Sequence, residues 1–433
     1  MSAQTRLASL KTLLAHVLAQ TKLDIGFVLW DGSTVPADLA PGALAIQIAD
    51  EGAVAAILRR PKLDTILNLW VAKRIDIRNG TAFDIAGLGG RVRGRDLRKA
   101  IDKRLAFATL LKFLFVPRGG PWPLETIGEV RPSDGSEGEN KTNIQYHYDV
   151  SNAFYALFLD PEMVYSCAYF TDWGNDIAQA QRDKLEMICR KLRLKPGERF
   201  LDIGCGWGAL VCHAAQHHGV NAHGVTLSQT QFDLAQDKVK RLGLQDRVTL
   251  ELRDYRTLEG RFDKIASIGM FEHVGIDNHA AYFKSVKQLL APDGLYLHHA
   301  IARPAKRNDK VFRKNKRAEY VAITRYIFPG GELDHIGMSA ANLERHGFEV
   351  HDVEAWREHY ARTCRLWHDR LLANHDKAVQ EIGEHKTRLW LIYLAGCSLG
   401  FERGTVGIFQ TLASRRKRGP SGLPPTRADL YRS

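Results

Sequence analysis

The chain has 433 residues, which is enough for two domains and a sizeable core. It has no apolar run of about 18 residues or more, and its longest apolar helical stretch, at 389–401, is too short to span a bilayer. A net charge of +12 indicates an anionic partner, either nucleic acid or lipid headgroups. The six cysteines show no CxxC spacing, so we expect no metal site and thiols that pack as small apolar residues in a reducing cytoplasm.

The first predicted element is an amphipathic helix near the N-terminus. Its leucines from Leu7 to Leu18 recur at the spacing of one helical face. We expect this face to pack on its own domain or on a dimer partner, and an interfacial membrane helix is the alternative. Lys11 and His16 interrupt the apolar pattern and no cleavage-site signature follows, so we expect no signal peptide.

Three basic clusters lie further along the chain. Each is either a solvated surface or a membrane-docking site, worth about 1 kcal/mol per Lys or Arg near anionic lipid. The first precedes the apolar stretch at 105–116, the second follows residue 302, and the third is 415–418. The first two comprise Arg91, Arg93, Arg95, Arg98, Lys99, Lys103 and Arg104, and then Arg303, Lys306, Arg307, Lys310, Arg313, Lys314, Lys316 and Arg317.

A glycine-rich turn connects a predicted strand to a predicted helix. Residues 199–203 (RFLDI) read as a short buried strand, GCGWG occupies 204–208, and an apolar helical stretch follows. Glycines at such a turn let the backbone approach a ligand, and the helix N-terminus favours polar or anionic ligand groups. The next predicted strand, 221–228, leads to Thr226, Ser228 and Gln231 where an NAD enzyme would carry Asp or Glu for the ribose, which argues against NAD.

Strands and helices continue to alternate after this point. Further strands are predicted at 248–254, 262–270, 294–302, 348–356 and 406–413, with a helix near 277–290. This alternation predicts a mostly parallel, doubly wound α/β sheet. Ligands bind at the carboxyl ends of the strands in such sheets, so we expect residues 202–208, Thr226, Tyr255 and Glu272 at that edge.

Two further motifs, YSCAYF at 165–170 and GMFEHVG at 269–275, add a thiol, a carboxylate and aromatic rings. With QYHYDVSN, LDIGCGWG, GVTLSQTQ, RDYR, RYIFPGGEL and HGFEV, they make the chain resemble the cyclopropane-fatty-acyl-phospholipid synthases, which are related to the mycolic acid cyclopropane synthases. The resemblance runs from about residue 145 to about residue 411. It implies a Rossmann-like class I methyltransferase sheet preceded by a small α+β N-terminal domain.

The resemblance implies that S-adenosylmethionine is the co-substrate. Carried over motif by motif, YSCAYF and the glycine loop would bind the co-substrate, GVTLSQTQ would meet the ribose, and RDYR would lie near the adenine. The implied residues are Tyr165, Ser166, Asp202, Gly204, Cys205, Gly206, Trp207, Gly208, Thr226, Gln231, Tyr255 and Arg256.

The resemblance also implies the reaction, which is methyl transfer to the cis double bond of an unsaturated phospholipid acyl chain. A bound bicarbonate would remove a proton so that a cyclopropane ring closes. Its cage would comprise Cys167, Glu272, His299 with the backbone of Ile301, and Tyr360. The cage requires Glu272 to accept the bicarbonate hydroxyl proton while the other groups donate.

Some site residues carry open alternatives. Only one of His298 and His299 can face the site on an alternating strand, and Cys167 could be a packed small residue. Cys397 matches a family cysteine that has been proposed as catalytic, but alkene methylation needs no thiol nucleophile, so we favour packing. Aromatic wall residues are expected because aromatic faces stabilise a cation, and the candidates are Tyr146, Tyr148, Tyr165, Tyr169 and Phe170.

The sequence predicts four parts: a small lipid-docking or dimer domain at 1–117, a flexible linker at 118–143, the methyltransferase domain at 144–414 and a basic tail at 415–433. We expect a cytoplasmic homodimer that associates peripherally with anionic lipid at the inner face of the cell membrane. One rival is a fatty-acid C-methyltransferase whose product is a methylene or methyl-branched chain. A nucleic-acid-binding protein on an inactive methyltransferase fold is disfavoured, because Glu272, Cys167 and His299 are intact and no RNA-binding module is recognisable.

Overall fold

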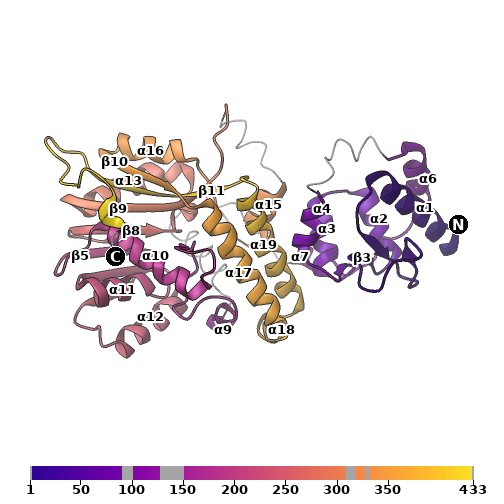
Figure 1. Cartoon of the computed structure of the whole chain (residues 1–433), viewed down its shortest axis with the longest axis horizontal. Helices are drawn as coiled ribbons and strands as arrows, with labels where there is room; N and C mark the ends of the chain where they lie inside the picture. Colours follow the sequence, from indigo (N-terminus) through magenta and orange to yellow (C-terminus); the bar gives the residue numbers. More distant parts are fainter. Residues whose placement is uncertain (1, 90–100, 127–150, 309–317, 328–330, 432–433) are drawn as a thin grey trace. The chain divides into compact units, whose positions relative to one another are not determined.

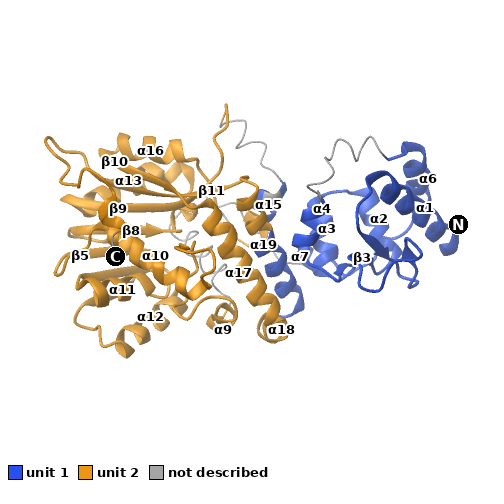
Figure 2. Cartoon of the chain, in the orientation of Figure 1, with its two compact units in different colours: residues 1–129, 317–322, 383–395 blue, residues 130–316, 323–382, 396–433 orange. Residues whose placement is uncertain are grey.

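The computed structural model describes residues 2–89, 101–126, 151–308, 318–327 and 331–431. The chain divides into two compact units, drawn in different colours in Figure 2. Unit 1 comprises residues 1–129, 317–322 and 383–395, and unit 2 comprises 130–316, 323–382 and 396–433. We expected 144–414 to form one domain, whereas two segments of that range belong to unit 1. The expected linker beyond residue 126 lies outside the described residues.

Unit 1 is built on a four-stranded sheet in the order β2-β1-β3-β4, with bounds Thr34–Val35, Gly26–Val28, Ala45–Ile48 and Ile75–Arg78. Its helices are α1 Ala3–Thr21, α2 Glu51–Arg59, α3 Leu63–Val71, α4 Ala82–Gly89, α6 Lys103–Phe113 and α7 Pro123–Thr126. Leu10 of α1 is buried and Leu7, Leu14 and Leu18 pack against the same core. The leucine face of α1 therefore packs within its own unit.

The segment 383–395 is attached to unit 1 by Arg388, which contacts residues that lie far from it in the sequence. Its guanidinium lies 4.1 Å from the ring centroid of Trp70 and donates to the Trp70 carbonyl at 2.8 Å. It also pairs with Asp76 at 3.0 Å. A buried arginine that stacks and pairs in this way holds the segment 383–395 in unit 1, although this segment is far in sequence from the rest of that unit.

Unit 2 contains a seven-stranded sheet in the order β10-β11-β9-β8-β5-β6-β7. The pairs among β9, β8, β5, β6 and β7 are parallel, and β11 is antiparallel to both β9 and β10. The predicted doubly wound α/β sheet is therefore confirmed, with one reversed strand. The bounds are β5 Arg199–Ile203, β6 Asn221–Thr226, β7 Val248–Leu252, β8 Phe262–Ile268, β9 Leu290–Ala302, β10 Phe348–Ala355 and β11 Gly407–Arg415.

Helices cover both faces of this sheet (Figure 1). Phe200 points into a core with α10 Ile177–Leu192 and α11 Ala209–His218, with α12 Gln229–Arg241 beside them. The next residue, Leu201, points into a second core with α13 His279–Leu289 and α16 Ile336–Arg345. Successive strand residues face opposite sides, so β5 feeds both cores.

The remaining helices are α9 Asn152–Ala156, α15 Ala318–Tyr326, α17 Arg357–Ala373, α18 His375–Ile382 and α19 Glu384–Glu402. Short 3₁₀ turns lie at Tyr255–Thr257, Phe271–His273, Ile276–Asn278 and Ala428–Leu430. The expected basic tail is folded in part, because Arg415 ends β11 and Asp429 pairs with Arg193 of unit 2 at 2.9 Å. Within the described residues, no helix has the length and apolar character needed to cross a membrane.

Candidate active site

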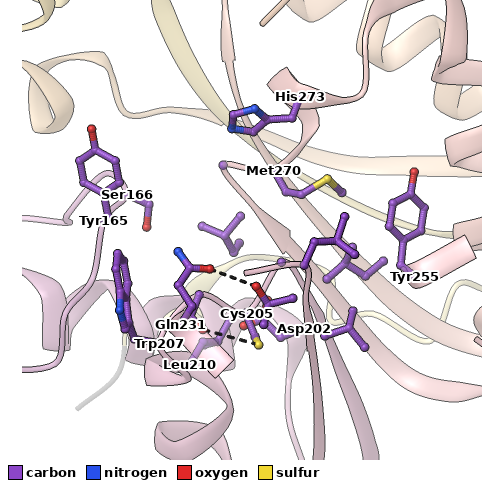
Figure 3. A pocket seen from close by; sticks show the side chains of 18 of the residues that line it. Tyr165, Ser166, Asp202, Cys205, Trp207, Leu210, Gln231, Tyr255, Met270 and His273 are labelled. Atoms are coloured by element: carbon purple, nitrogen blue, oxygen red, sulfur yellow. Dashed lines mark hydrogen bonds between the residues drawn. The ribbon is translucent and has the colours of Figure 1, made fainter. Parts of the chain in front are cut away.

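A pocket opens in unit 2 at the carboxyl ends of β5 and β6 (Figure 3). Tyr165 and Trp207 lie toward one side of it and Tyr255 toward the other. The structure brings together at its wall every residue that the sequence resemblance implies for the co-substrate except Gly208. The edge position is the one that a doubly wound sheet offers to a ligand.

The glycine loop has a backbone conformation that residues with a side chain rarely adopt. Gly204, Gly206 and Gly208 have φ of 81°, 55° and 79°. A Cβ on Gly204 would lie 3.0 Å from the Met270 side chain, whereas one on Gly206 would meet nothing within 4 Å. Gly208 is the N-cap of α11 and does not line the pocket, so its contribution is to the turn itself. The open side at Gly206 lets a ligand lie against the backbone.

Hydrogen bonds fix two parts of the pocket wall. Thr226 donates from Oγ1 to Oε1 of Gln231 at 3.0 Å, which fixes both side chains at the wall. At the far end, Arg256 pairs with Asp254 at 2.7 Å, so its guanidinium holds the turn. The Tyr255 ring packs edge-on against the ring of Tyr282, with 5.6 Å between the centroids, and burial raises the pKa of Tyr255.

Lys184 of α10 is a pocket residue that sequence reasoning missed. It is buried, and its Nζ donates to Oγ of Ser166 at 3.0 Å. Burial lowers the pKa of Lys184 to about 8, and burial raises the pKa of nearby Asp202 to about 7. Oδ1 of Asp202 has no hydrogen-bond partner among the described residues. The available signal was a lysine on the buried face of an amphipathic helix, repeated seven residues later by Lys191.

None of the five expected cage residues lines this pocket. Cys167, Glu272 and His299 are buried, whereas Ile301 and Tyr360 are half-buried. Oε1 of Glu272 accepts from the Ile301 backbone N–H at 2.7 Å, while Oε2 is buried without a partner among the described residues. Burial raises the pKa of Glu272 to about 7. His299 is buried, and its Nε2 likewise has no partner in the described part of the chain. Two unsatisfied buried atoms, one of them on a carboxylate, are costly unless a ligand completes them.

Trp356 connects His299 with Cys167. Its ring lies edge-on to the His299 imidazole at a centroid distance of 5.3 Å, and its carbonyl oxygen accepts from Cys167 Sγ at 3.8 Å. Burial raises the pKa of the Cys167 thiol, so it is a neutral donor. His298 faces the other side of the sheet, where it bonds the Tyr296 hydroxyl at 3.0 Å, as strand alternation predicts.

Tyr360 lies among thiols and a second phenol. Burial raises its pKa, and Cys364, Tyr165, Cys167 and Cys397 raise it further. The Tyr360 hydroxyl is therefore protonated at neutral pH and can donate. Cys397 of α19 is therefore close to Tyr360, as Cys364 is.

Aromatic rings line the region around these groups. Tyr165 packs against Trp367 at 5.1 Å and against Tyr155 at 5.4 Å. Tyr169 stacks on Trp356 at 4.7 Å, and the Phe170 ring lies parallel to His359. The expected wall residues Tyr146 and Tyr148 lie outside the described residues. The wall is apolar and rich in π faces, which excludes water and suits a cationic intermediate.

A cluster with metal-ligand chemistry lies elsewhere in unit 2, where the sequence showed none. The ligand atoms of Cys189, His213 and His218 lie within 4.8 Å of one another. Glu186 accounts for both histidines, since its Oε2 lies 3.3 Å and 3.0 Å from their Nε2 atoms. These hydrogen bonds and Arg190 lower the pKa of Glu186 to about 2, against the effect of its burial. Glu186 and Cys189 come from α10 and the two histidines from α11, so the cluster lies where these two helices pack.

The basic clusters have mixed outcomes. Residues 91–99 and 310–317 lie outside the described residues. Arg303 is buried and donates to the Leu333 carbonyl at 3.2 Å, so it belongs to the fold. Lys417 pairs with Asp293 at 2.6 Å and Arg416 with Glu344 at 3.8 Å.

Residues 136–411 match the family model described as mycolic acid cyclopropane synthetase. The chain belongs to this family. It is similar to a "Probable fatty acid methyltransferase" of Pseudomonas putida, with 37% identity over 97% of this chain and 99% of that protein. It is also similar to the cyclopropane-fatty-acyl-phospholipid synthase of Escherichia coli K12, with 39% identity over 62% of this chain and 66% of that protein.

Solved structures agree with the family assignment. The mycolic acid cyclopropane synthase CmaA1, in a complex with SAH and CTAB, is 34% identical and has a TM-score of 0.60. The match covers 64% of this chain and 98% of that one. The chain is therefore an S-adenosylmethionine-dependent methyltransferase with the class I fold, as the sequence predicted.

Proposed function

We propose that the protein transfers the methyl group of S-adenosylmethionine to the cis double bond of an unsaturated phospholipid acyl chain and closes a cyclopropane ring. The observation that carries the proposal is a pair of buried atoms that have no hydrogen-bond partner among the described residues, Oε2 of Glu272 and Nε2 of His299. The His299 ring packs against an aromatic side chain. The Pseudomonas and Escherichia relatives support a lipid acyl chain as the acceptor.

The pocket residues supply the placement that this reaction needs. An alkene is a poor nucleophile, so the sulfonium methyl must be held against the double bond, and placement alone can contribute several kcal/mol. The loop at 202–207, Thr226 and Gln231 would hold the nucleoside, and Tyr165 and Ser166 the methionine end. Methylation produces a carbocation, which water would quench, so the rings of Tyr165 and Tyr169 both stabilise charge and exclude solvent.

The cage residues fit a small anion with one hydroxyl group. Oε2 of Glu272 would accept, and Nε2 of His299 and the Tyr360 hydroxyl would donate. The protonated Cys167 thiol would also donate, once its single proton turns away from the Trp356 carbonyl. Bicarbonate has both kinds of group, and when bound it would accept the proton lost from the added methyl carbon. Glu272 orients that hydroxyl, and the backbone N–H of Ile301 holds Glu272 in place.

Helix α6 of unit 1 supplies a surface for lipid. Four side chains of this helix and the residues directly after it are exposed: Phe107 by 60%, Leu111 by 50%, Leu114 by 41% and Phe115 by 91%. Phe113, on another side, is buried in the unit 1 core. Lys103, Arg104 and Lys112 flank this exposed stripe. An apolar face with a basic rim suits the interface of an anionic bilayer.

These features support a cytoplasmic enzyme that binds peripherally to the inner face of the cell membrane through unit 1. We propose a homodimer as its assembly. Sedimentation of the purified protein with and without anionic vesicles tests both points. A monomer would leave the site proposal standing, because every cage residue comes from one chain.

The second candidate is a fatty-acid C-methyltransferase whose product carries a methylene or methyl branch. It is favoured by the Pseudomonas relative, because that similarity extends over 97% of this chain, including unit 1. The same carbocation would lose a different proton, so the position of the proton acceptor decides the product.

One experiment separates the two candidates. The protein is incubated with S-adenosylmethionine and vesicles of cis-unsaturated phospholipid, and the acyl chains are analysed by gas chromatography and mass spectrometry. A gain of one CH₂ that resists hydrogenation supports ring closure. A gain that hydrogenates to a methyl branch supports the second candidate, and no gain with bound co-substrate contradicts both.

A further inference from the structure

We propose that Lys191 and Gln410 are positioning residues that hold His299 in the tautomer with its proton on Nε2. His299 then presents a hydrogen-bond donor to the anion of the cage. The inference rests on the proposed function for its catalytic meaning, but the tautomer itself is a property of the protein alone.

The orientation of the Gln410 amide is dictated by Lys191. Nζ of Lys191 lies 2.8 Å from Oε1 of Gln410, and both side chains are buried. An ammonium group has only donors, so the amide atom facing it must be the oxygen. The amide nitrogen is thereby turned to the other side, where it lies 2.9 Å from Nδ1 of His299.

The sheet register makes this contact direct. Gln410 of β11 is the antiparallel partner of His299 on β9, so the two side chains lie on the same face. The Gln410 amide N–H can only donate, and Nδ1 must therefore accept. Burial and the cations of Lys184 and Lys191 lower the pKa of His299 well below its ordinary value, so the ring is neutral. A neutral imidazole that accepts at Nδ1 carries its proton on Nε2.

Lys191 is itself held in place. It forms an ion pair with Glu354 and lies 5.1 Å from the ring centroid of Trp356. Trp356 in turn packs edge-on against His299. The lysine therefore has little freedom to leave the amide oxygen, and the chain of contacts from Lys191 through Gln410 ends at a donor, Nε2, with no partner among the described residues.

Gln410→Glu is the decisive variant because it keeps the size of the side chain and removes the donor. One carboxylate oxygen still accepts from Lys191, and the other accepts from Nδ1–H of His299. The tautomer is thereby inverted, and an Nε2 lone pair faces the anion. Lys191→Met has a weaker effect, because it only frees the amide to rotate.

The first measurement is the tautomer, read from long-range ¹H–¹⁵N correlations of histidine-labelled full-length protein. The His299 signals are identified by their loss in His299→Ala. We expect a protonated Nε2 in the wild type and a protonated Nδ1 in Gln410→Glu. A protonated Nδ1 in the wild type overturns the inference whatever the enzyme does.

The second measurement is turnover as a function of added bicarbonate. Gln410→Glu should raise the bicarbonate concentration at half-maximal rate by about tenfold or more, the usual scale for losing a hydrogen bond to a charged group. Binding of S-adenosylhomocysteine, measured by calorimetry, should stay unchanged. Lys264→Met is the matched control. Lys264 of β8 is also a buried lysine, and it pairs with Glu198 at 3.7 Å. This variant should leave the bicarbonate dependence and the affinity for S-adenosylhomocysteine unchanged.

The outcomes separate the two proposals. If the wild type has the expected tautomer but its turnover does not depend on bicarbonate, the proposed cage is contradicted and the tautomer assignment stands. Equal loss of co-substrate binding and turnover in Gln410→Glu contradicts a positioning role and indicates a structural one.

Discussion

The Ile301 backbone N–H donates to Oε1 of Glu272 at 2.7 Å and leaves Oε2 of the same carboxylate buried and unpartnered among the described residues. Ile301 is on β9, whereas Glu272 is in the 3₁₀ turn that follows β8. The bond therefore joins two neighbouring strands of the sheet at their carboxyl edge. It fixes the direction of the carboxylate and reserves one oxygen for a ligand.

Replacing Glu272 by Gln tests that reserved oxygen. Gln keeps an oxygen for Ile301 but offers an N–H where the proposal needs an acceptor. We expect turnover to fall by about a hundredfold or more while S-adenosylhomocysteine still binds, because a donor would then face the hydroxyl group of the anion. Steady-state kinetics and calorimetry on the purified variant measure both, and near-normal turnover would defeat the cage.

The same substitution should stabilise the protein at high pH. Burial raises the pKa of Glu272 from 4.5 to about 7, so the folded chain keeps a proton that the unfolded chain releases within this range. Stability therefore falls as pH rises from 4.5 to about 7, by up to about 3 kcal/mol. The Glu272→Gln variant has no such loss, because an amide does not titrate in this range.

Urea unfolding of the wild type and Glu272→Gln at pH 5 and pH 8 provides the measurement. Asp202 and Asp334 also have raised pKa values, but both are present in both proteins. Asp202 cancels in the difference, and Asp334 contributes only its coupling to Glu272, whose pKa its charge raises. The variant should gain on the wild type between pH 5 and pH 8. An identical difference at the two pH values would mean that Glu272 is not buried as a neutral acid.

The exposed stripe on α6 predicts how the protein binds vesicles. Phe107→Ser with Phe115→Ser should reduce binding to anionic vesicles by about tenfold or more, since each large side chain contributes about 1.5 kcal/mol or more when buried. Ile66→Ser is the control, because Ile66 is a similarly exposed (42%) apolar residue on α3 of the same unit. Co-sedimentation measures binding, and equal loss in the control would point away from α6.

Lys184 should contribute to co-substrate binding. Lys184→Met removes the donor to Ser166 and the cation beside Asp202, so affinity for S-adenosylhomocysteine should fall by about tenfold. Lys238→Met is the control, because Lys238 is buried and pairs with Glu162 at 3.0 Å but does not line the pocket. The idea fails if calorimetry gives the two variants the same affinity.

Cys397 should be dispensable for chemistry. Cys397→Ala leaves Glu272, His299 and Cys167 in place, and alkene methylation requires no thiol nucleophile. We expect turnover within about threefold of the wild type and a modest loss of stability of about 1 kcal/mol, from the truncated packing. A loss of turnover at normal folding and co-substrate affinity would make Cys397 a catalytic residue.

The order of the elements around the pocket was predictable because its signals are local. The strand at 199–203 and the helix at 209–218 coincide with β5 and α11, since a short apolar run, a glycine turn and helical periodicity lie next to one another in the chain. The edge that carries Asp202, Thr226 and Tyr255 followed from strand direction alone. The alternation of His298 and His299 across β9 was equally local.

The sequence by itself determined the family, the doubly wound sheet and the residue types that motifs place at its carboxyl edge. Only the tertiary structure decided which partners those residues meet. Lys191 and Gln410 are 219 residues apart, and no periodicity links them, yet the packing of α10 on the sheet joins them beside His299. Burial, which sets the pKa of Glu272 and leaves its oxygen unpartnered among the described residues, exists only once distant segments have excluded water from the same volume.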